Sequence, residues 1–149
     1  MKAVLITLFT AMIPVVELRG AIPAGTAAGL PVFAAFLIAF IGNMIPVPFI
    51  ILFIRNVFAW LRVRNSKLDA FVTKIEARAM KKADLVKKYE RLGLVLLVAI
   101  PLPGTGAWTG ALVAALLDMR LKDAIPLIAL GVLISGLIVM MITYHVIAL

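Results

Sequence analysis

No lysine, arginine, aspartate or glutamate occurs between Gly20 and Ile54, and a second uncharged stretch runs from Leu92 to Leu117. A helix that crosses the hydrocarbon core of a bilayer needs about 20 apolar residues, and both stretches are longer than that. Of the 149 residues, 64% are hydrophobic, whereas soluble domains are about 45–50% apolar. One small globule could not bury so much apolar surface, so the sequence predicts an integral membrane protein.

The composition also excludes several kinds of site. The chain has no cysteine and a single histidine, His145, so we expect no disulfide, no metal site and no cofactor. Of the 15 lysines and arginines, 11 lie between Arg55 and Arg91. This clustering favours a segment on the membrane surface over a nucleic-acid-binding protein.

Breaks in the first uncharged stretch predict where its helices lie. The apolar run from Ala3 to Val16 is short, as in re-entrant or interfacial segments. This run stops at Glu17. Gly29-Leu30-Pro31 divides the uncharged stretch that follows, and a full span is predicted over Pro31 to Ile54. Pro46 and Pro48 should kink or loosen this span, because proline removes a backbone donor.

The basic segment 55–91 has apolar residues at spacings of three and four, which predicts an amphipathic helix. Ser66 and Asp69 fit a capping box at its start, and Gly93 fits a stop at its end. Lysine and arginine on the polar face suit a helix that lies on anionic lipid headgroups. The alternative is a solvated helix that packs on the rest of the protein.

The second uncharged stretch contains "IPLPGTGAWTG" (Ile100 to Gly110), in which two prolines and three glycines cannot sit in an ordinary helix. Broken backbone survives at membrane depth only when it is buried in protein or lines a wet cavity. We therefore expect two half-helices around a broken tip, the second of them starting near Ala107. After a charged turn, Ala124 to Leu149 should form the second full span.

The two halves of the chain resemble each other. Each has an Ile-Pro step, a broken glycine-rich region, a proline that opens a long span and a glycine further along that span. The matching pairs are Ile13-Pro14 with Ile100-Pro101, Pro31 with Pro126, and Gly42 with Gly136. Paired interruptions of this kind are typical of transporter folds and point to the binding site.

The predicted fold is therefore an all-α integral membrane protein of two inverted repeats, residues 1–54 and 92–149. Each repeat is a re-entrant helical hairpin plus one transmembrane helix, and the basic amphipathic segment 55–91 joins them in a single membrane domain. This segment should be cytoplasmic, with both termini extracytoplasmic, in a multi-pass protein of the cell membrane. The rival is four plain spans with both termini inside.

Glu17 and Arg19 lie inside "PVVELRGAIPAG", where charge is expensive and marks a functional candidate. Between Pro14 and Pro23 the chain is expected to be extended, so that both side chains point to the same side. Arg19 could then bind a phosphate or carboxylate, and Glu17 could orient Arg19 or take up a proton. The alternative is a structural ion pair that holds the tip of the hairpin.

The second tip carries further candidates. Free amides around Gly104-Thr105-Gly106, at the start of a half-helix, could bind an anion, with hydroxyls from Thr105 and Thr109; the alternative is close packing through small residues. Trp108 could line a pathway or anchor the chain at the membrane interface. The full candidate substrate and proton pathway is Glu17, Arg19, Gly20, Pro23, Pro101, Pro103, Gly104, Thr105, Gly106, Trp108 and Thr109.

The segments "ELRGAIPAG" (Glu17 to Gly25) and "PLPGTGAWTGALVAALL" (Pro101 to Leu117) together resemble the small multidrug export protein family, which is similar to the DedA membrane proteins. The resemblance implies a transporter whose paired re-entrant tips meet near the midplane. For DedA relatives it implies proton-coupled movement of a lipid phosphate carrier. The expected function is thus proton-coupled translocation of an anionic lipid or small amphiphile.

Two other functions compete with transport. A lipid-modifying membrane enzyme would need an acid cluster, a histidine pair or a Ser–His arrangement, and the sequence has none that stands out, so an enzyme is not expected. A non-transporting scaffold or assembly subunit needs only hairpins and a surface helix. The expected partners are membrane lipids, protons as the coupling ion, and a second copy of the chain in a homodimer. No nucleic-acid partner is expected.

Overall fold

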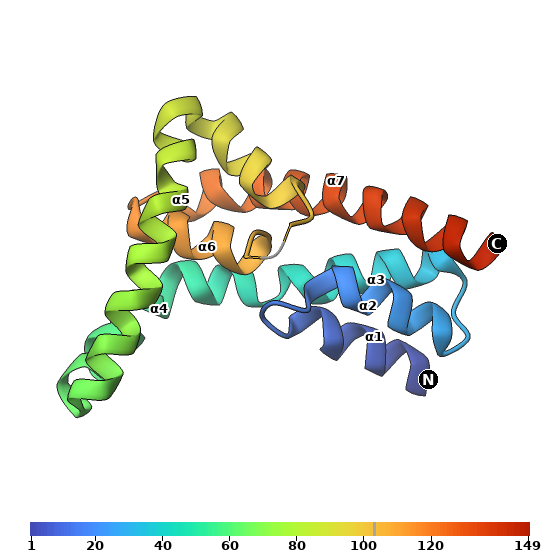
Figure 1. The fold of residues 1–149 in the computed structure, drawn as a ribbon, viewed down its shortest axis with the longest axis horizontal. Coiled ribbons are helices and arrows are strands. Elements are labelled where there is room, and N and C mark those ends of the chain that lie inside the picture. Colours follow the sequence, from blue (N-terminus) through green and yellow to red (C-terminus); the bar gives the residue numbers. More distant parts are fainter. Residues whose placement is uncertain (103) are drawn as a thin grey trace.

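The structure is a computed structural model that describes residues 1–102 and 104–149, and this part of the chain is helical (Figure 1). The helices are α1 (Lys2–Met12), α2 (Glu17–Ala27), α3 (Val32–Met44), α4 (Pro46–Arg64), α5 (Ser66–Ala99), α6 (Ala107–Leu116) and α7 (Leu121–Ala148). Both termini lie at one end of the molecule, and the connection between α4 and α5 lies at the opposite end.

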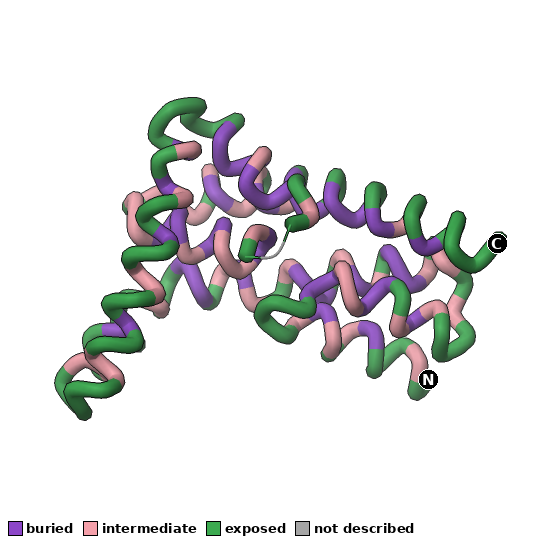
Figure 2. Tube along the Cα trace, viewed as in Figure 1, coloured by how far each residue is buried: buried purple, intermediate pink, exposed green. Residues whose placement is uncertain are grey.

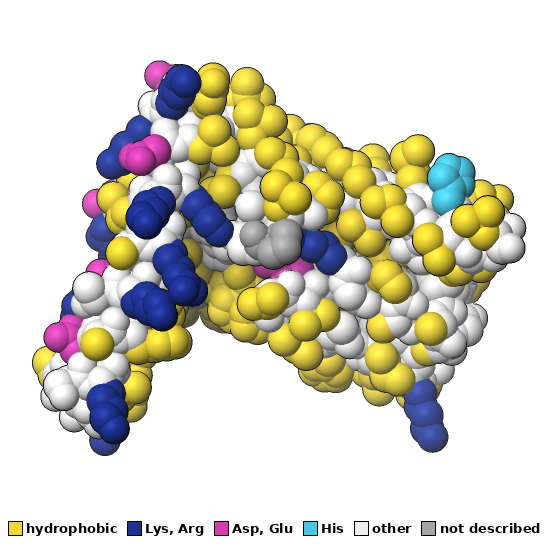
Figure 3. All heavy atoms as spheres, viewed as in Figure 1, with side chains coloured by type: hydrophobic (Ala, Val, Ile, Leu, Met, Phe, Trp, Pro, Cys, Tyr) yellow, Lys and Arg dark blue, Asp and Glu magenta, His cyan; other side chains and the backbone are white. Residues whose placement is uncertain are grey.

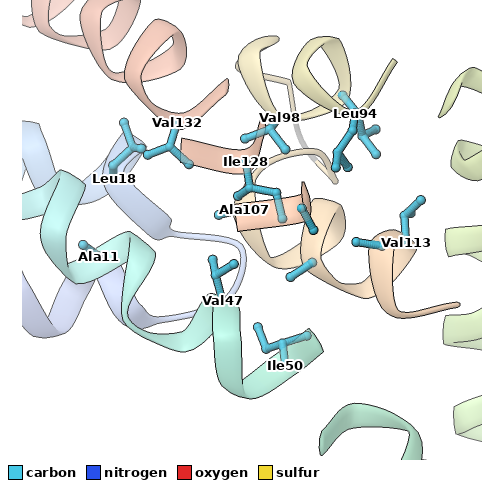
Figure 4. Packing of buried hydrophobic residues seen from close by; sticks show 14 of the residues in the cluster. Ala11, Leu18, Val47, Ile50, Leu94, Val98, Ala107, Val113, Ile128 and Val132 are labelled. Carbon is cyan, nitrogen blue, oxygen red and sulfur yellow. The ribbon is translucent and has the colours of Figure 1, made fainter. Parts of the chain in front are cut away.

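The helices form two groups. Helices α1 and α2 pack on each other and on α3, whereas α6 packs on α4 and α5, and α5 packs on α7. Contacts between α3 and α7 and between α2 and α7 join the two groups. Figure 4 shows Leu18 of α2 beside Val132 of α7, and Val98 of α5 beside Ile128 of α7. The core therefore runs through both groups.

Two segments are long and apolar enough to cross a membrane, Val32–Arg64 (α3 continued by α4) and Leu121–Ala148 (α7). The two predicted spans are thus confirmed as helices, although the first continues past Ile54 to Arg64. It is interrupted at Ile45, directly before Pro46, as the prolines predicted. The outer faces of the spans are exposed (Figure 2), and the exposed side chains include large apolar ones, for example Phe33 and Phe49 of the first span, which suits contact with lipid.

Helices α1, α2 and α6 are too short to span. They have 11, 11 and 10 residues, or about 15–17 Å at 1.5 Å per residue, roughly half of a bilayer core. Ile13 (φ −72°, ψ 127°) ends α1 and Ile100 (φ −73°, ψ 117°) ends α5. Each precedes a proline, which disfavours helical backbone in the residue before it. The same Ile-Pro step therefore ends both helices in the same geometry.

The connections into the two spans are also alike. The amide of Leu30 donates to the carbonyl of Gly25 at 3.0 Å, and the amide of Met119 donates to the carbonyl of Ala114 at 2.9 Å. Just before these residues the backbone is left-handed, at Gly29 (φ 100°) and Asp118 (φ 56°). Both α2 and α6 therefore end in a Schellman-type turn.

The first helical hairpin consists of α1 and α2, and the second consists of the end of α5 and α6; the turn of each hairpin is called its tip. Glycines let the two spans approach these hairpins closely. A Cβ on Gly42 would lie 2.5 Å from the carbonyl oxygen of Leu8 in α1, and a Cβ on Gly131 would lie 3.0 Å from that of Val95 in α5. Gly42 and Gly131 thus make the same kind of close contact, whereas Gly136, which the sequence paired with Gly42, packs against an aromatic ring of α3. Sequence spacing alone could not distinguish two glycines on one helix.

The amphipathic helix starts at Ser66, one residue earlier than a cap at Ser66 predicts. The side chain of Asn65 accepts the amide of Lys67 at 2.9 Å, so Asn65 is the N-cap. Asp69 does not form a capping box with Ser66, because its carboxylate binds the guanidinium of Arg62 at 2.7 Å. Asp69 therefore joins α5 to α4, and Asn65 caps the helix.

The predicted stop at Gly93 lies three residues beyond the break in the structure, which is at Glu90. Helix α5 bends at Glu90 (φ 54°, ψ −128°) and continues to Ala99. A Cβ on Gly93 would lie only 2.7 Å from the Cα of Val86. Gly93 is therefore needed for close approach of the chain beyond the bend, rather than for ending the helix.

We expect Gly131→Ala to destabilise the protein by about 1–3 kcal/mol, the usual cost of overpacking. The new Cβ would lie 2.6 Å from the Cβ of Val98, whose branched side chain cannot move aside easily. This cost should exceed the helix-propensity gain of about 1 kcal/mol. Thermal unfolding in detergent would measure it, with Leu130→Ala on the exposed face of α7 as a control. A melting temperature at or above that of the unmodified protein would contradict the prediction.

Candidate functional site

Glu17 lies where the two hairpins meet. It is the first residue of α2, has a left-handed backbone (φ 51°) and is only 3% exposed. Its carboxylate accepts the amide of Trp108 at 3.1 Å and the amide of Ala107 at 3.3 Å. These amides begin α6 and have no partner within that helix. Glu17 of the first hairpin therefore caps α6 of the second, where a negative charge also offsets the helix dipole.

Gly106 makes room for this contact. Its backbone is left-handed (φ 115°), and a Cβ there would overlap the carboxylate of Glu17, 2.9 Å from its carboxyl carbon. A side chain at this position would therefore be strained and would also displace Glu17. Gly106 is best explained by this close approach.

Arg19 binds the other helix end of the second hairpin. Its guanidinium donates to the carbonyl oxygen of Leu102, to that of Ile100 at 3.4 Å and to the hydroxyl of Thr105 at 2.8 Å. The two carbonyls follow the end of α5, where the negative end of the helix dipole favours a cation. They also accept backbone amides, from Leu102 and Thr105. The acid and the base of "ELR" thus bind opposite sides of one tip, Glu17 at the start of α6 and Arg19 at the turn that follows α5.

Trp108 makes a contact in the reverse direction. Its indole N–H donates to the carbonyl of Met12, at the end of α1, at 3.2 Å. Thr109 stays within the second hairpin, since its hydroxyl donates to the carbonyl of Gly104 at 3.2 Å. Each hairpin therefore contributes a side chain that binds the backbone of the other hairpin, Glu17 from the first and Trp108 from the second.

The expectation of an extended first tip is wrong, and the alternative of a structural ion pair is not observed among the described residues either. The chain from Glu17 onward is helical rather than extended, and Pro23 lies inside α2 with its ring exposed. The four ion pairs of the described residues do not include one between Glu17 and Arg19. Spacing of two residues on a helix directs the side chains apart, so each reaches a different part of the facing tip.

A cavity of about 510 Å³ lies at this junction, between α4, α5, α6 and both tips. Its walls are mainly apolar. The lining residues are Pro14, Val15, Glu17, Ile50, Ile54, Phe58, Phe71, Ile75, Arg78, Ala79, Lys82, Gly104, Thr105, Trp108, Thr109 and Leu112.

Five of the predicted site residues line this cavity: Glu17, Gly104, Thr105, Trp108 and Thr109. The predicted residues outside the lining are Arg19, Gly20, Pro23, Pro101 and Gly106. Of these, Arg19 and Gly106 still act at the tips through the contacts above. Pro103 lies outside the described residues.

Sequence reasoning missed the contribution of α5. Arg78 and Lys82 lie one helical turn apart and share the cavity face with Phe71 and Ile75. Basic residues along the apolar face of the amphipathic segment were the available signal. Figure 3 shows lysine and arginine side chains gathered over the side of the molecule formed by α5, whereas much of the remaining surface is hydrophobic.

Fold and site together define an all-helical membrane protein with two broken helical hairpins that meet at a cavity. Residues 17–138 match the family described as "Putative small multi-drug export protein", and the chain belongs to this family. The family description points to a membrane transporter rather than an enzyme. No curated protein and no solved structure matches the chain. Within the described residues, no group of three acidic or histidine side chains could hold a metal ion.

If Glu17 caps α6, then Glu17→Ala should cost about 1–3 kcal/mol, because it leaves buried amides without an acceptor. Gly106→Ala should also destabilise, because its methyl group displaces the carboxylate. In the double variant that methyl group enters the space that the carboxylate leaves. The double variant should therefore be destabilised by about 1 kcal/mol less than the sum of the two single variants. Chemical unfolding in detergent would measure this cycle.

The matched control is Asp84→Ala, which removes an exposed carboxylate from α5 and should change the unfolding free energy by less than about 0.5 kcal/mol. Strict additivity of Glu17→Ala and Gly106→Ala would contradict the contact between them.

Proposed function

We propose that this protein is a membrane transporter that moves a small amphiphile through the cavity between its two hairpin tips. The observation that carries the proposal is the position of this cavity, at the junction of two helix breaks. Cavities of about 300–1,000 Å³ hold ligands of drug size, and this one has about 510 Å³. Apolar walls with a few polar groups suit a molecule that has both characters.

The proposal includes re-entrant hairpins in two inverted repeats. Three observations support it: the short length of α1, α2 and α6, the shared geometry at Ile13 and Ile100, and the shared turns at Gly25–Leu30 and Ala114–Met119. A hairpin that returns to its own side plus one span crosses the membrane once per half. The two halves then have opposite orientations, as in many transporters.

The contacts of Glu17 and Arg19 suggest how the tips separate and close. As long as Glu17 is charged, it can accept both amides at the start of α6. Protonation would remove the negative charge that the helix end favours and would weaken this cap. Proton uptake by Glu17 would therefore loosen the second tip from the first, which is a route to the proposed proton coupling.

Blocking the cavity should stop transport. Ile54 lines it, so Ile54→Trp would fill it, whereas Leu52 is on the exposed side of the same helix and Leu52→Trp would not. In proteoliposomes loaded with fluorescent single-chain amphiphiles of negative, positive or no charge, we expect flux of at least one. Ile54→Trp should reduce that flux about tenfold or more, equivalent to about 1.4 kcal/mol, and Leu52→Trp should leave it unchanged.

Absence of flux for all three amphiphiles, or equal flux through Ile54→Trp and the unmodified protein, would reject the transport proposal. It would favour the non-transporting scaffold instead.

The inverted arrangement also predicts topology. With the basic segment 55–91 in the cytoplasm, both termini should lie outside, and the structure has them together at the end away from the α4–α5 turn. A reporter that is active only in the cytoplasm should be silent after Leu149 and active when inserted at Asn65. Activity at Leu149 would support four plain spans.

A further inference from the structure

We infer that the cavity binds a single-chain amphiphile with an anionic head, a carboxylate or phosphate monoester, which Arg78 and Lys82 of α5 recognise. This inference rests on the proposed function, because it names the substrate class of the same cavity. It moves anion recognition away from Arg19, where the sequence suggested it.

The charge balance of the cavity supports an anionic ligand. Its charged lining residues are Glu17, Arg78 and Lys82. The Glu17 carboxylate already accepts two amides, and Arg19 nearby is engaged by two carbonyls and a hydroxyl. Neither Arg78 nor Lys82 takes part in the ion pairs of the described residues. The cavity therefore presents more cationic than anionic groups to a ligand.

Lys82 holds its charge at the tip of the second hairpin. Its ammonium lies 2.8 Å from the position that a Cβ on Gly104 would take. Burial lowers the pKa of Lys82, and the nearby charges of Arg78 and Arg19 lower it further. A bound anion would offset all three effects, since it supplies the opposite charge that this ammonium lacks.

The apolar part of the cavity suits one alkyl chain. Along α5, Phe71 and Ile75 precede Arg78 and Lys82 on the cavity face, so the wall changes from apolar to basic toward the tips. Ile54 and the remaining side chains of α4 in the lining, Ile50 and Phe58, are also apolar. A head at the basic end thus places its tail between α4 and α5.

The volume of the cavity and the positive charge of its lining make the site selective. A cavity of about 510 Å³ is in the range for a ligand of drug size, which favours one chain over a two-chain lipid. A cationic amphiphile would bring a like charge next to Arg78 and Lys82 and should be rejected. The site therefore favours anionic over cationic amphiphiles.

Trp108 lines the cavity and can report binding, because the chain has only two tryptophans. The test uses the full chain in neutral detergent with Trp60→Phe, so that Trp108 is the sole fluorophore. Quenching is measured with a terminally brominated dodecanoate, its phosphate monoester analogue, the matching alkyltrimethylammonium, and bromoacetate, which has no tail. We expect the two long-chain anions to quench at concentrations about tenfold or more below the other two, about 1.4 kcal/mol.

Charge-removal variants test the assigned residues. Arg78→Gln with Lys82→Gln should raise the half-quenching concentration of the long-chain anions about tenfold, about 1.4 kcal/mol. Lys74→Gln with Lys81→Gln removes the same charge from exposed positions outside the cavity and should leave it unchanged. Circular dichroism and gel filtration would verify that both pairs of variants remain folded.

Three results would overturn the inference: equal quenching by the ammonium probe, equal effects of the two variant pairs, or displacement of the probe by phosphatidylglycerol at the same mole fraction, which would indicate a membrane lipid. Each can occur while Ile54→Trp still blocks flux, so the transport proposal would survive. Conversely, selective quenching without any flux would keep the site and reject transport.

Discussion

Charged side chains of one hairpin satisfy the helix ends of the other, and the rest of the structure depends on this exchange. A helix that ends inside a membrane leaves amides and carbonyls without water to bind. Glu17 supplies the acceptor for the start of α6, and Arg19 supplies donors for the carbonyls after α5. The cost of withdrawing these two charges from water is offset because each meets the helix pole of opposite sign. The tips are thereby held together without direct pairing of the acid and the base.

This arrangement separates two tasks that charged residues perform here. The charges of the first hairpin are occupied by the backbone of the second, so they position the tips and define one end of the cavity. The charges of α5 face the cavity with no partner among the ion pairs of the described residues, so they are available to a ligand. An amphipathic helix that follows a spanning helix can therefore also form a wall of the cavity.

Much of the helical framework could be predicted from local patterns. The two spans, the proline break at Ile45 and the start of α6 near Ala107 follow from hydrophobic run length and from proline and glycine. The end of the amphipathic helix was predicted at Gly93 and not at Glu90, because the left-handed backbone occurs at a residue with no such preference. The N-cap was misplaced by one residue, since Asp69 binds Arg62 of the preceding helix, a contact invisible to local pattern.

By itself the sequence determined that the chain enters a membrane, where its backbone breaks, and which charged residues lie at the first break. These properties depend on the cost of apolar surface in water and on the backbone chemistry of proline and glycine, which act over a few neighbouring residues. Only the tertiary structure decided what those charges bind and why position 106 requires glycine. It also decided that Arg78 and Lys82 share a cavity with Glu17. Each of these depends on segments far apart in the chain, which become neighbours only when the two hairpins pack together.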